Sequence, residues 1–509
     1  MPEISILFTP ENGKYVEKVK LPDDTIKDLH IDELISEITS VKKEYQLEDY
    51  FFTPLRDLDT IHYRQEISKN IEKANVFEAL KFFGNLMSKV HSMTKLINEL
   101  YYEENKYGWL LEAVLTYCNV LYSLNNLLNS KEITASGLKL LGEYLSKYIS
   151  SEAFQNMSSE AKRLKEEISN LTYILIIEPG KFTVKPFEGE REYTSVIEEI
   201  FGKFNDEECS EEYKFDIVKA TGITHIEAKI TEFLKKLYPE PFEKLKNFYE
   251  RYLNFLDETI VNFEREVQFY ISYFEFISNL KSKGLKFCYP SFTKDILTVN
   301  DAFDIVLASK EKLTSKIVCN DIFLKPDEKM IIITGPNQGG KTTYARMFGL
   351  IHYIASLGLP VPASYAEVLL PSGIYTHFER REDVKSEKSK LEEELFRLRK
   401  IIEEIDEESI VILNEPFSSA ALHDAIELSE KIIREIIEKN VTAVWVTFLD
   451  TLTKLDKKIV SMVALVSADD PTIRTFKVTR KDADGKAYAI SLAEKYGLTY
   501  EKIKGRFSI

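Results

Sequence analysis

Residues 330–342, MIIITGPNQGGKT, give the clearest indication of the fold class of this chain. An apolar run leads into a glycine-rich segment of the pattern G-x-x-x-x-G-K-[ST], which typically follows a strand and opens a helix. Glycines let backbone N–H groups wrap a phosphate, and the start of the helix adds the positive end of its dipole. The alternative is a glycine turn with a chance lysine, but the flanking strand and helix favour a phosphate loop.

The residues around this loop alternate between short apolar runs and helical patterns. Such alternation is typical of a mostly parallel sheet that is covered by helices on both faces. We therefore predict an α/β domain over residues 291–509. Strands are expected at 316–323, 330–334, 367–370, 410–413, 441–447, 462–467 and 473–479, and helices at 342–357, 388–405, 422–438 and 487–496.

Residues 1–290 have a different pattern. Apolar residues recur at three- and four-residue steps over about 25–165 and 224–280, which predicts an all-α region. An apolar run, a Glu-Pro-Gly turn and an alternating stretch predict a small β-hairpin near 171–187. The aromatic residues of the second helical stretch are typical of helix packing rather than of a base-stacking surface.

Composition limits the classes of function. The 509 residues suggest about three domains by length, and 67 basic against 83 acidic residues give a net charge of −16. This charge excludes a wholesale basic coat for nucleic acid, although not a local basic patch. The four cysteines lie far apart, which argues against a disulfide framework or a cysteine zinc site. No secretory signal or long apolar run occurs, so we expect a cytoplasmic protein that does not span a membrane.

Two positions of the phosphate loop and two at the end of the 410–413 strand carry the candidate chemistry. Lys341 would reach the β/γ-phosphate oxygens of ATP, and the Thr342 hydroxyl would ligate Mg²⁺. Asn414 stands where a P-loop sheet usually has an acid that supports the metal; its amide accepts a hydrogen bond from a metal-bound water but brings no charge. Glu415 is the candidate general base.

The segment TGPNQGGKTTY, residues 334–344, resembles the ATPase loop of the MutS family, the proteins related to DNA mismatch repair MutS, where it reads T-G-P-N-M-G-G-K-S-T-Y. The likeness continues at 357–363, at Asn320 and at 496–504, and so covers about 300–505. Residues 61–65, IHYRQ, are similar to the family's I-x-x-R-Q. The resemblance implies an ABC-class P-loop ATPase, preceded by a helical lever and clamp, with ATP and Mg²⁺ as cofactors.

The resemblance also implies roles for individual residues. Glu415 and Lys341 are the catalytic candidates, and Thr342 and, through water, Asn414 are the metal candidates. Ser389 takes the place of the serine that reaches the partner subunit's γ-phosphate, which implies a homodimer with composite sites. The nucleotide-binding candidates are Gly335, Pro336, Asn337, Gln338, Gly339, Gly340, Lys341, Thr342, Thr343, Asn414 and Ser389.

An ordinary structural role for Ser389 stays open. It precedes the expected helix, and Glu392 follows three residues later, so the two could form a capping box. Glu387, where the family has glycine, adds a negative charge beside the expected phosphate. Two further departures, Asn414 and Phe448 in place of the family's switch histidine, predict a slow ATPase.

Mismatch recognition itself is not expected. The sequence begins almost directly at core-like residues, and we expect neither the mismatch-reading domain nor the family's C-terminal dimer extension. Residues 248–250 spell F-x-E, the wedge motif, but within a helical aromatic stripe, so we predict a packing role. Residues 201–260 carry 9 basic and 13 acidic residues, a net charge opposite to what DNA phosphates require.

Two functions remain open on these grounds. The first is a MutS-related ATPase that couples ATP binding and hydrolysis to binding of DNA, including mismatched or branched DNA, or of a protein partner. The second is a slow or inactive module that dimerises with nucleotide and does not recognise mismatches. Lys341, Thr342 and Glu415 favour the first, whereas Asn414 and Phe448 favour the second.

Overall fold

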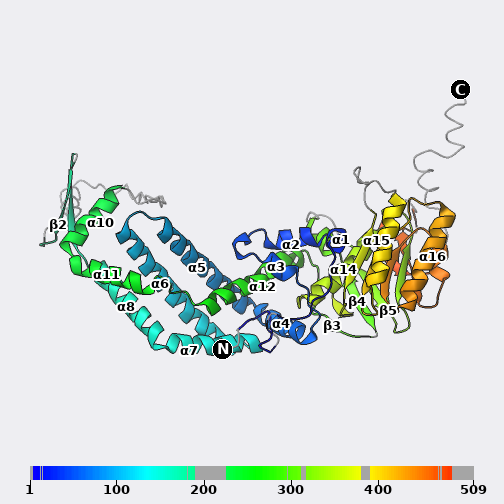
Figure 1. Cartoon of the computed structure of the whole chain (residues 1–509), viewed down its shortest axis with the longest axis horizontal. Coiled ribbons are helices and arrows are strands. Elements are labelled where there is room, and N and C mark those ends of the chain that lie inside the picture. The colour runs from blue at the N-terminus through cyan, green and yellow to red at the C-terminus, as the bar shows by residue number, and fades with distance from the viewer. Residues whose placement is uncertain are drawn as a thin grey trace, which may run out of the picture. The chain divides into compact units, whose positions relative to one another are not determined.

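The computed structural model describes residues 4–11, 13, 15–179, 181–189, 225–294, 296–310, 317–379, 390–467, 469–470 and 473–483 (Figure 1). The chain forms two compact units, each made of more than one segment. The first comprises Met1–Phe77, Thr134–Leu138 and Asn262–Ile509, and the second comprises Glu78–Ile133 and Lys139–Val261. These units differ from the division expected near residue 290, because the amino-terminal segment joins the α/β part.

The centre of the first unit is a six-stranded sheet with the order β12-β11-β6-β10-β9-β8. All neighbouring strands are parallel except β12, which runs antiparallel to β11. The predicted mostly parallel sheet is therefore confirmed. Its strands are β6 (Met330–Thr334), β8 (Ile374–Phe378), β9 (Ile410–Asn414), β10 (Thr442–Val446), β11 (Ile459–Val466) and β12 (Arg474–Arg480).

Helices cover both faces of this sheet, as predicted. Every residue of β6, β8, β9 and β10 is buried, and for β6, β9 and β10 this burial explains the apolar runs in the sequence. On one face Trp445 and Leu413 pack with residues of α15 and α16, and on the other face α14 contacts β9 and β10. These helices are α14 (Lys341–Ser356), α15 (Lys390–Glu404) and α16 (Leu422–Glu438).

A second, four-stranded sheet has the order β3-β7-β4-β5, with β4 antiparallel to both of its neighbours. The sequence did not indicate this sheet, and two strands that were expected in the main sheet, near 316–323 and 367–370, belong to it instead. The alternating runs reveal strands but not which sheet they join. Its strands are β3 (Ser291–Phe292), β4 (Leu297–Ala302), β5 (Asn320–Leu324) and β7 (Tyr365–Val368).

The amino-terminal helices of the first unit are bound to the α/β part by buried hydrogen bonds. Thr25 Oγ1 donates to the Ile374 carbonyl at 2.8 Å, and Thr376 Oγ1 donates to Asp28 Oδ2 at 2.8 Å. Tyr353 of α14 donates to the Phe51 carbonyl at 2.8 Å. These helices are α1 (Asp23–Asp28), α2 (Ile31–Thr39), α3 (Glu48–Phe51) and α4 (Leu58–Ile71), and the short α13 (Ile305–Lys310) follows β4.

The second unit is helical apart from one hairpin, within its described residues. The predicted hairpin is confirmed as β1 (Tyr173–Glu178) and β2 (Lys181–Pro186), which pair antiparallel. Helix α6 contacts both α8 and α11. The helices that lie wholly in this unit are α6 (Glu103–Leu128), α8 (Glu152–Ser169), α10 (His225–Leu237) and α11 (Pro239–Tyr252). Three further helices have residues in both units, and they are α5 (Ala74–Glu99), α7 (Ser136–Ser150) and α12 (Glu258–Ser282).

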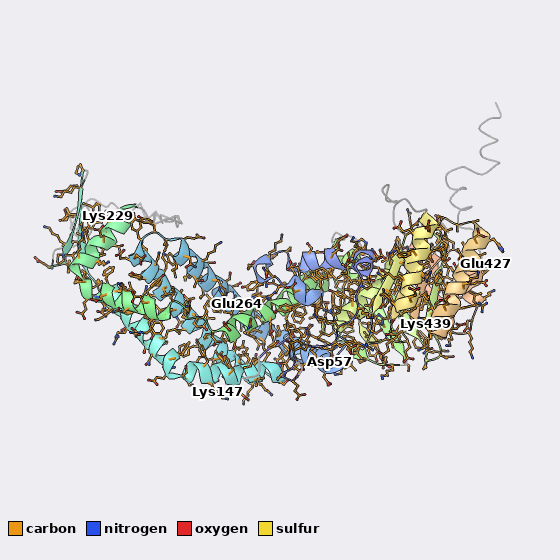
Figure 2. All side chains as sticks on the ribbon, viewed as in Figure 1. Asp57, Lys147, Lys229, Glu264, Glu427 and Lys439 are labelled. Carbon is orange, nitrogen blue, oxygen red and sulfur yellow. The ribbon has the colours of Figure 1, made fainter. Side chains whose placement is uncertain are left out.

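Phe248, the first residue of the F-x-E triplet, is fully buried in α11, with its ring 4.8 Å from that of Tyr252. The predicted packing role is thus confirmed. Charged side chains such as Lys229 and Glu427 lie on the outer faces of the helices, where Figure 2 labels them. Among the described helices none is long and apolar enough to cross a membrane. The predicted helix at 487–496 lies outside the described residues.

Candidate functional site

The predicted phosphate loop joins the end of β6 to the start of α14, in a backbone conformation that favours glycine. Gly335 has φ +120° and Gly340, which precedes α14, has φ +95°. A Cβ at Gly335 would lie 2.8 Å from the carbonyl oxygen of Ala464 on β11. Both glycines are therefore required by the fold of the loop. Gln338, with φ +58°, adopts the left-handed conformation although it has a side chain.

Lys341 lies at the centre of the loop, with only 4% of its side chain exposed. Its Nζ donates to the carbonyl oxygens of Gly335 at 3.0 Å and Pro336 at 3.4 Å, and lies 3.5 Å from Glu415 Oε1. Burial lowers the pKa of Lys341, whereas the Glu415 carboxylate opposes that shift. The ammonium group is thus held where several oxygen atoms converge.

The ring of Phe448 covers this ammonium, with its centroid 4.2 Å from Nζ. Phe448 follows β10 and is half exposed, at 51%. An aromatic face attracts a cation at this distance. The residue that stands in place of the family's histidine therefore contacts Lys341 directly.

Glu415 follows β9 in a strained turn. It has φ +54° and Phe417 has φ +62°, and non-glycine residues persist in this conformation only where their surroundings hold them. One such contact is the bond from the Glu415 amide to the Val446 carbonyl at 2.9 Å. Burial raises the pKa of the Glu415 carboxyl, Lys341 lowers it, and the negative charge of Glu379 raises it.

The side chains of Thr342 and Asn414, the two metal candidates, lie in direct contact. The Thr342 hydroxyl donates to Asn414 Oδ1 at 2.9 Å, and Asn414 is buried. These two neutral oxygens fit a Mg²⁺ ion that keeps several waters and binds phosphate oxygens. In the described part of the chain, no group of three or more His, Cys, Asp or Glu is arranged so that it could hold a metal ion, so a metal here would depend on water and on a ligand.

A cavity of about 460 Å³ opens beside the loop, a volume in the usual range of small-molecule sites. The sequence motif selects six of its lining residues, Asn337 to Thr342, together with Thr343 and Glu415. Tyr344 and Met347 of α14 also line the cavity, as does Asn320, which the resemblance includes. The other lining residues come from distant segments that no local pattern connects to the loop, and they are Asp304, Leu307, Ile317, Val318 and Phe476.

Asn320, which the resemblance includes, bonds two segments in one wall of the cavity. Its Nδ2 donates to the Phe476 carbonyl at 3.1 Å, and its Oδ1 accepts from the Val478 amide at 2.8 Å. The side chain therefore links β5 of the small sheet to β12 of the large sheet. Ser389 lies outside the described residues, as does Glu387.

The buried parallel sheet and the glycine-rich loop between β6 and α14 define an ATPase domain of the ABC type. The family model of MutS domain V matches residues 331–505, the part of the chain that contains this loop. This part of the chain belongs to the MutS family.

Three similar proteins share one name, DNA mismatch repair protein MutS. The protein from Thermotoga maritima is 25% identical over 495 residues, which cover 91% of this chain and 60% of the relative. The one from Thermosipho melanesiensis is 30% identical over 264 residues, 50% of this chain and 31% of the relative. The one from Fervidobacterium nodosum is 32% identical over 193 residues, which cover 37% of this chain and 23% of the relative. The chain thus spans less than two thirds of the length of these relatives.

Proposed function

We propose that this protein is a MutS-related ATPase that binds ATP with Mg²⁺ and uses the nucleotide to control its binding to DNA. The observation that carries this proposal is the convergence of Lys341, Glu415 and the Thr342–Asn414 pair on one glycine-rich loop beside a cavity. Each group supplies one part of phosphoryl-transfer chemistry, in which positioning and charge stabilisation do most of the work.

Lys341 would bind the β- and γ-phosphates. In the structure its ammonium is bonded to the loop carbonyls of Gly335 and Pro336. Phosphate oxygens carry full charge and are stronger acceptors than carbonyls, so they would take over these bonds. The loop amides and the start of α14 would add partial positive charge at the same place.

Thr342 and, through water, Asn414 would hold Mg²⁺, which would supply positive charge to offset that of the phosphates. The Asn414 side chain is neutral, so the site lacks one negative charge near the metal. We expect a weaker dependence of affinity on Mg²⁺ than an aspartate would give.

Glu415 would orient and deprotonate the attacking water. Its side chain is 21% exposed and lies beside Lys341, so it combines access to water with a fixed position. The contact between Phe448 and Lys341, and the amide at position 414, both favour slow turnover.

A second function is nucleotide-dependent dimerisation with little hydrolysis. The observation that favours it is the position of Phe448, whose ring covers Lys341. Phe448 stands where a polar switch residue is expected. In this arrangement ATP would close a homodimer through Ser389, whose partner-facing role remains a proposal.

Dimerisation through Ser389 predicts a change in size with nucleotide. The Glu415→Gln protein, which retains ATP, should dimerise with Mg-ATP, and adding Ser389→Ala should prevent this because the serine would bind the partner's γ-phosphate. Size-exclusion chromatography with light scattering measures both. If Ser389 only caps α15, the double variant should still dimerise, with stability lower by about 1 kcal/mol.

Coupling to DNA is tested by binding titrations with duplex, mismatched and branched DNA. We expect MgATP to change the DNA affinity by about 5-fold or more, the lower end of typical coupling between two sites. The slope of affinity against salt concentration reports the number of phosphates that are neutralised. Nucleotide-independent binding, or no binding to any of the three at low salt, would contradict the coupling to DNA and leave a protein as the partner.

A further inference from the structure

A basic side chain from another strand reaches the apex of the phosphate loop. Arg474 is the first residue of β12 and pairs with Val466 of β11, and β11 in turn pairs with β6, the strand that enters the loop. Arg474 Nε donates to the carbonyl oxygen of Asn337 at 3.1 Å. No motif in the sequence selects this arginine, because it lies 137 residues from the loop position that it contacts.

The bond to Asn337 determines the direction of the next backbone amide. A peptide unit is planar and trans, so the carbonyl of Asn337 and the N–H of Gln338 point in opposite directions. Asn337 and Gln338 line the cavity, whereas Arg474 is not among its lining residues in the described part of the chain. A carbonyl that is bonded to Arg474 therefore directs the Gln338 N–H away from Arg474, at a residue that lines the cavity.

This peptide needs support, because Gln338 has φ +58°. The left-handed conformation is unfavourable for a residue with a Cβ, and such residues persist where surrounding groups hold them. The Arg474 guanidinium is such a group, and as a charged donor it makes a stronger hydrogen bond than a neutral one.

We propose that Arg474 is a positioning residue for nucleotide binding: it holds the Asn337–Gln338 peptide so that the Gln338 amide faces the phosphates. This inference rests on the proposed function, in which the loop binds a nucleoside polyphosphate. It adds to Lys341 and the P-loop glycines a residue from β12 that sets the shape of the loop before the ligand arrives.

A direct electrostatic role for Arg474 predicts different behaviour and has to be separated from this one. Its positive charge acts on Lys341 and contributes to lowering the pKa of that ammonium, after the larger effect of burial. Two neighbouring cations repel each other and together attract an anion. An attraction of this kind would not depend on the conformation of Gln338.

The test is a double-mutant cycle between Arg474→Met, which removes the donor, and Gln338→Gly, which removes the penalty of the left-handed conformation. The full chain is titrated with fluorescent ADP and ATP analogues in the presence of Mg²⁺. We expect Arg474→Met to weaken binding by about tenfold, the loss of one hydrogen bond from a charged donor. The affinity of the Gln338→Gly variant is measured alongside, and in the double variant this substitution should restore most of the affinity that is lost in Arg474→Met.

Two results would overturn the positioning role. One is an unchanged affinity in Arg474→Met. The other is a loss that Gln338→Gly does not restore, which would assign Arg474 to direct attraction of the phosphates. Failure of the proposed function is distinct from both, because the wild-type chain would then bind neither analogue.

Discussion

Replacing Lys341 with alanine is expected to weaken ATP binding by about a hundredfold or more, since each hydrogen bond from a charged donor contributes about 1.5–3 kcal/mol and a phosphate would accept more than one. In the structure this ammonium is buried, bonded to two loop carbonyls and 3.5 Å from Glu415. The alanine variant loses the charge at the centre of the loop and keeps the backbone amides. Titration with a fluorescent ATP analogue measures the loss.

A matched control for Lys341→Ala is Lys431→Ala. Lys431 lies on the outer face of α16, 2.7 Å from Glu427 on the same helix, and its side chain is 65% exposed. Its removal changes the net charge of the protein by the same amount but leaves the loop intact, so the nucleotide affinity should stay the same. Equal affinity in wild type and Lys341→Ala would refute the assignment of residues 335–342 as the nucleotide loop.

The sequence correctly predicted the strand and the helix that flank the loop. Strand β6 begins and ends where the apolar run does, and α14 begins at Lys341, one residue before its expected start. The Thr342–Asn414 contact could also be anticipated, because a P-loop sheet places the end of a neighbouring strand beside the loop. Local pattern and sheet geometry were sufficient for these features.

The parts that the sequence missed depend on contacts between distant segments. Strand β8 contains Thr376 and His377, which break the apolar run, yet all five of its residues are buried. Thr376 is tolerated there because its hydroxyl donates to Asp28, 348 residues away. The pairing of Phe448 with Lys341 and of Arg474 with Asn337 likewise has no local signature.

The same long-range contacts explain why the division near residue 290 differs from the compact units. The sequence does change from a helical to an alternating pattern near residue 290. Arg64 of α4 nevertheless joins segments on both sides of this change, because it is fully buried and donates to the Leu7 carbonyl at 2.8 Å and the Leu357 carbonyl at 3.3 Å. Leu357 directly follows α14, the helix that starts at the phosphate loop. The pattern of apolar residues indicates secondary structure, whereas the packing of side chains decides which segments form one compact unit.

Glu415→Gln is expected to lower the single-turnover rate of ATP hydrolysis by about a hundredfold while ATP affinity changes little, because a positioned general base typically contributes about 10²–10⁴-fold. Glutamine keeps the shape of the side chain and a hydrogen-bond acceptor but does not take a proton from water. Quenched-flow measurement with enzyme in excess over radiolabelled ATP separates this step from product release.

The pH dependence should change with this variant as well. Burial raises the pKa of the Glu415 carboxyl above the ordinary glutamate value, and the base acts only when ionised. The wild-type rate should therefore fall on acidification at a pH above the ordinary glutamate pKa, and this fall should be absent in Glu415→Gln.

Asn414→Asp is the matched control, because it changes the residue next to Glu415 and adds a negative charge where Glu415→Gln removes one. It places a negative charge beside the Thr342 hydroxyl, 2.9 Å from the present amide oxygen, and should strengthen Mg²⁺-dependent binding or turnover, since bonds to charged partners are stronger by about 1 kcal/mol. A rate that falls in Glu415→Gln and rises in Asn414→Asp would identify hydrolysis at this site as a property of the chain. Equal rates in wild type and Glu415→Gln would instead leave ATP as a ligand that holds two subunits together, because the residue best placed to activate water would have no effect on its attack.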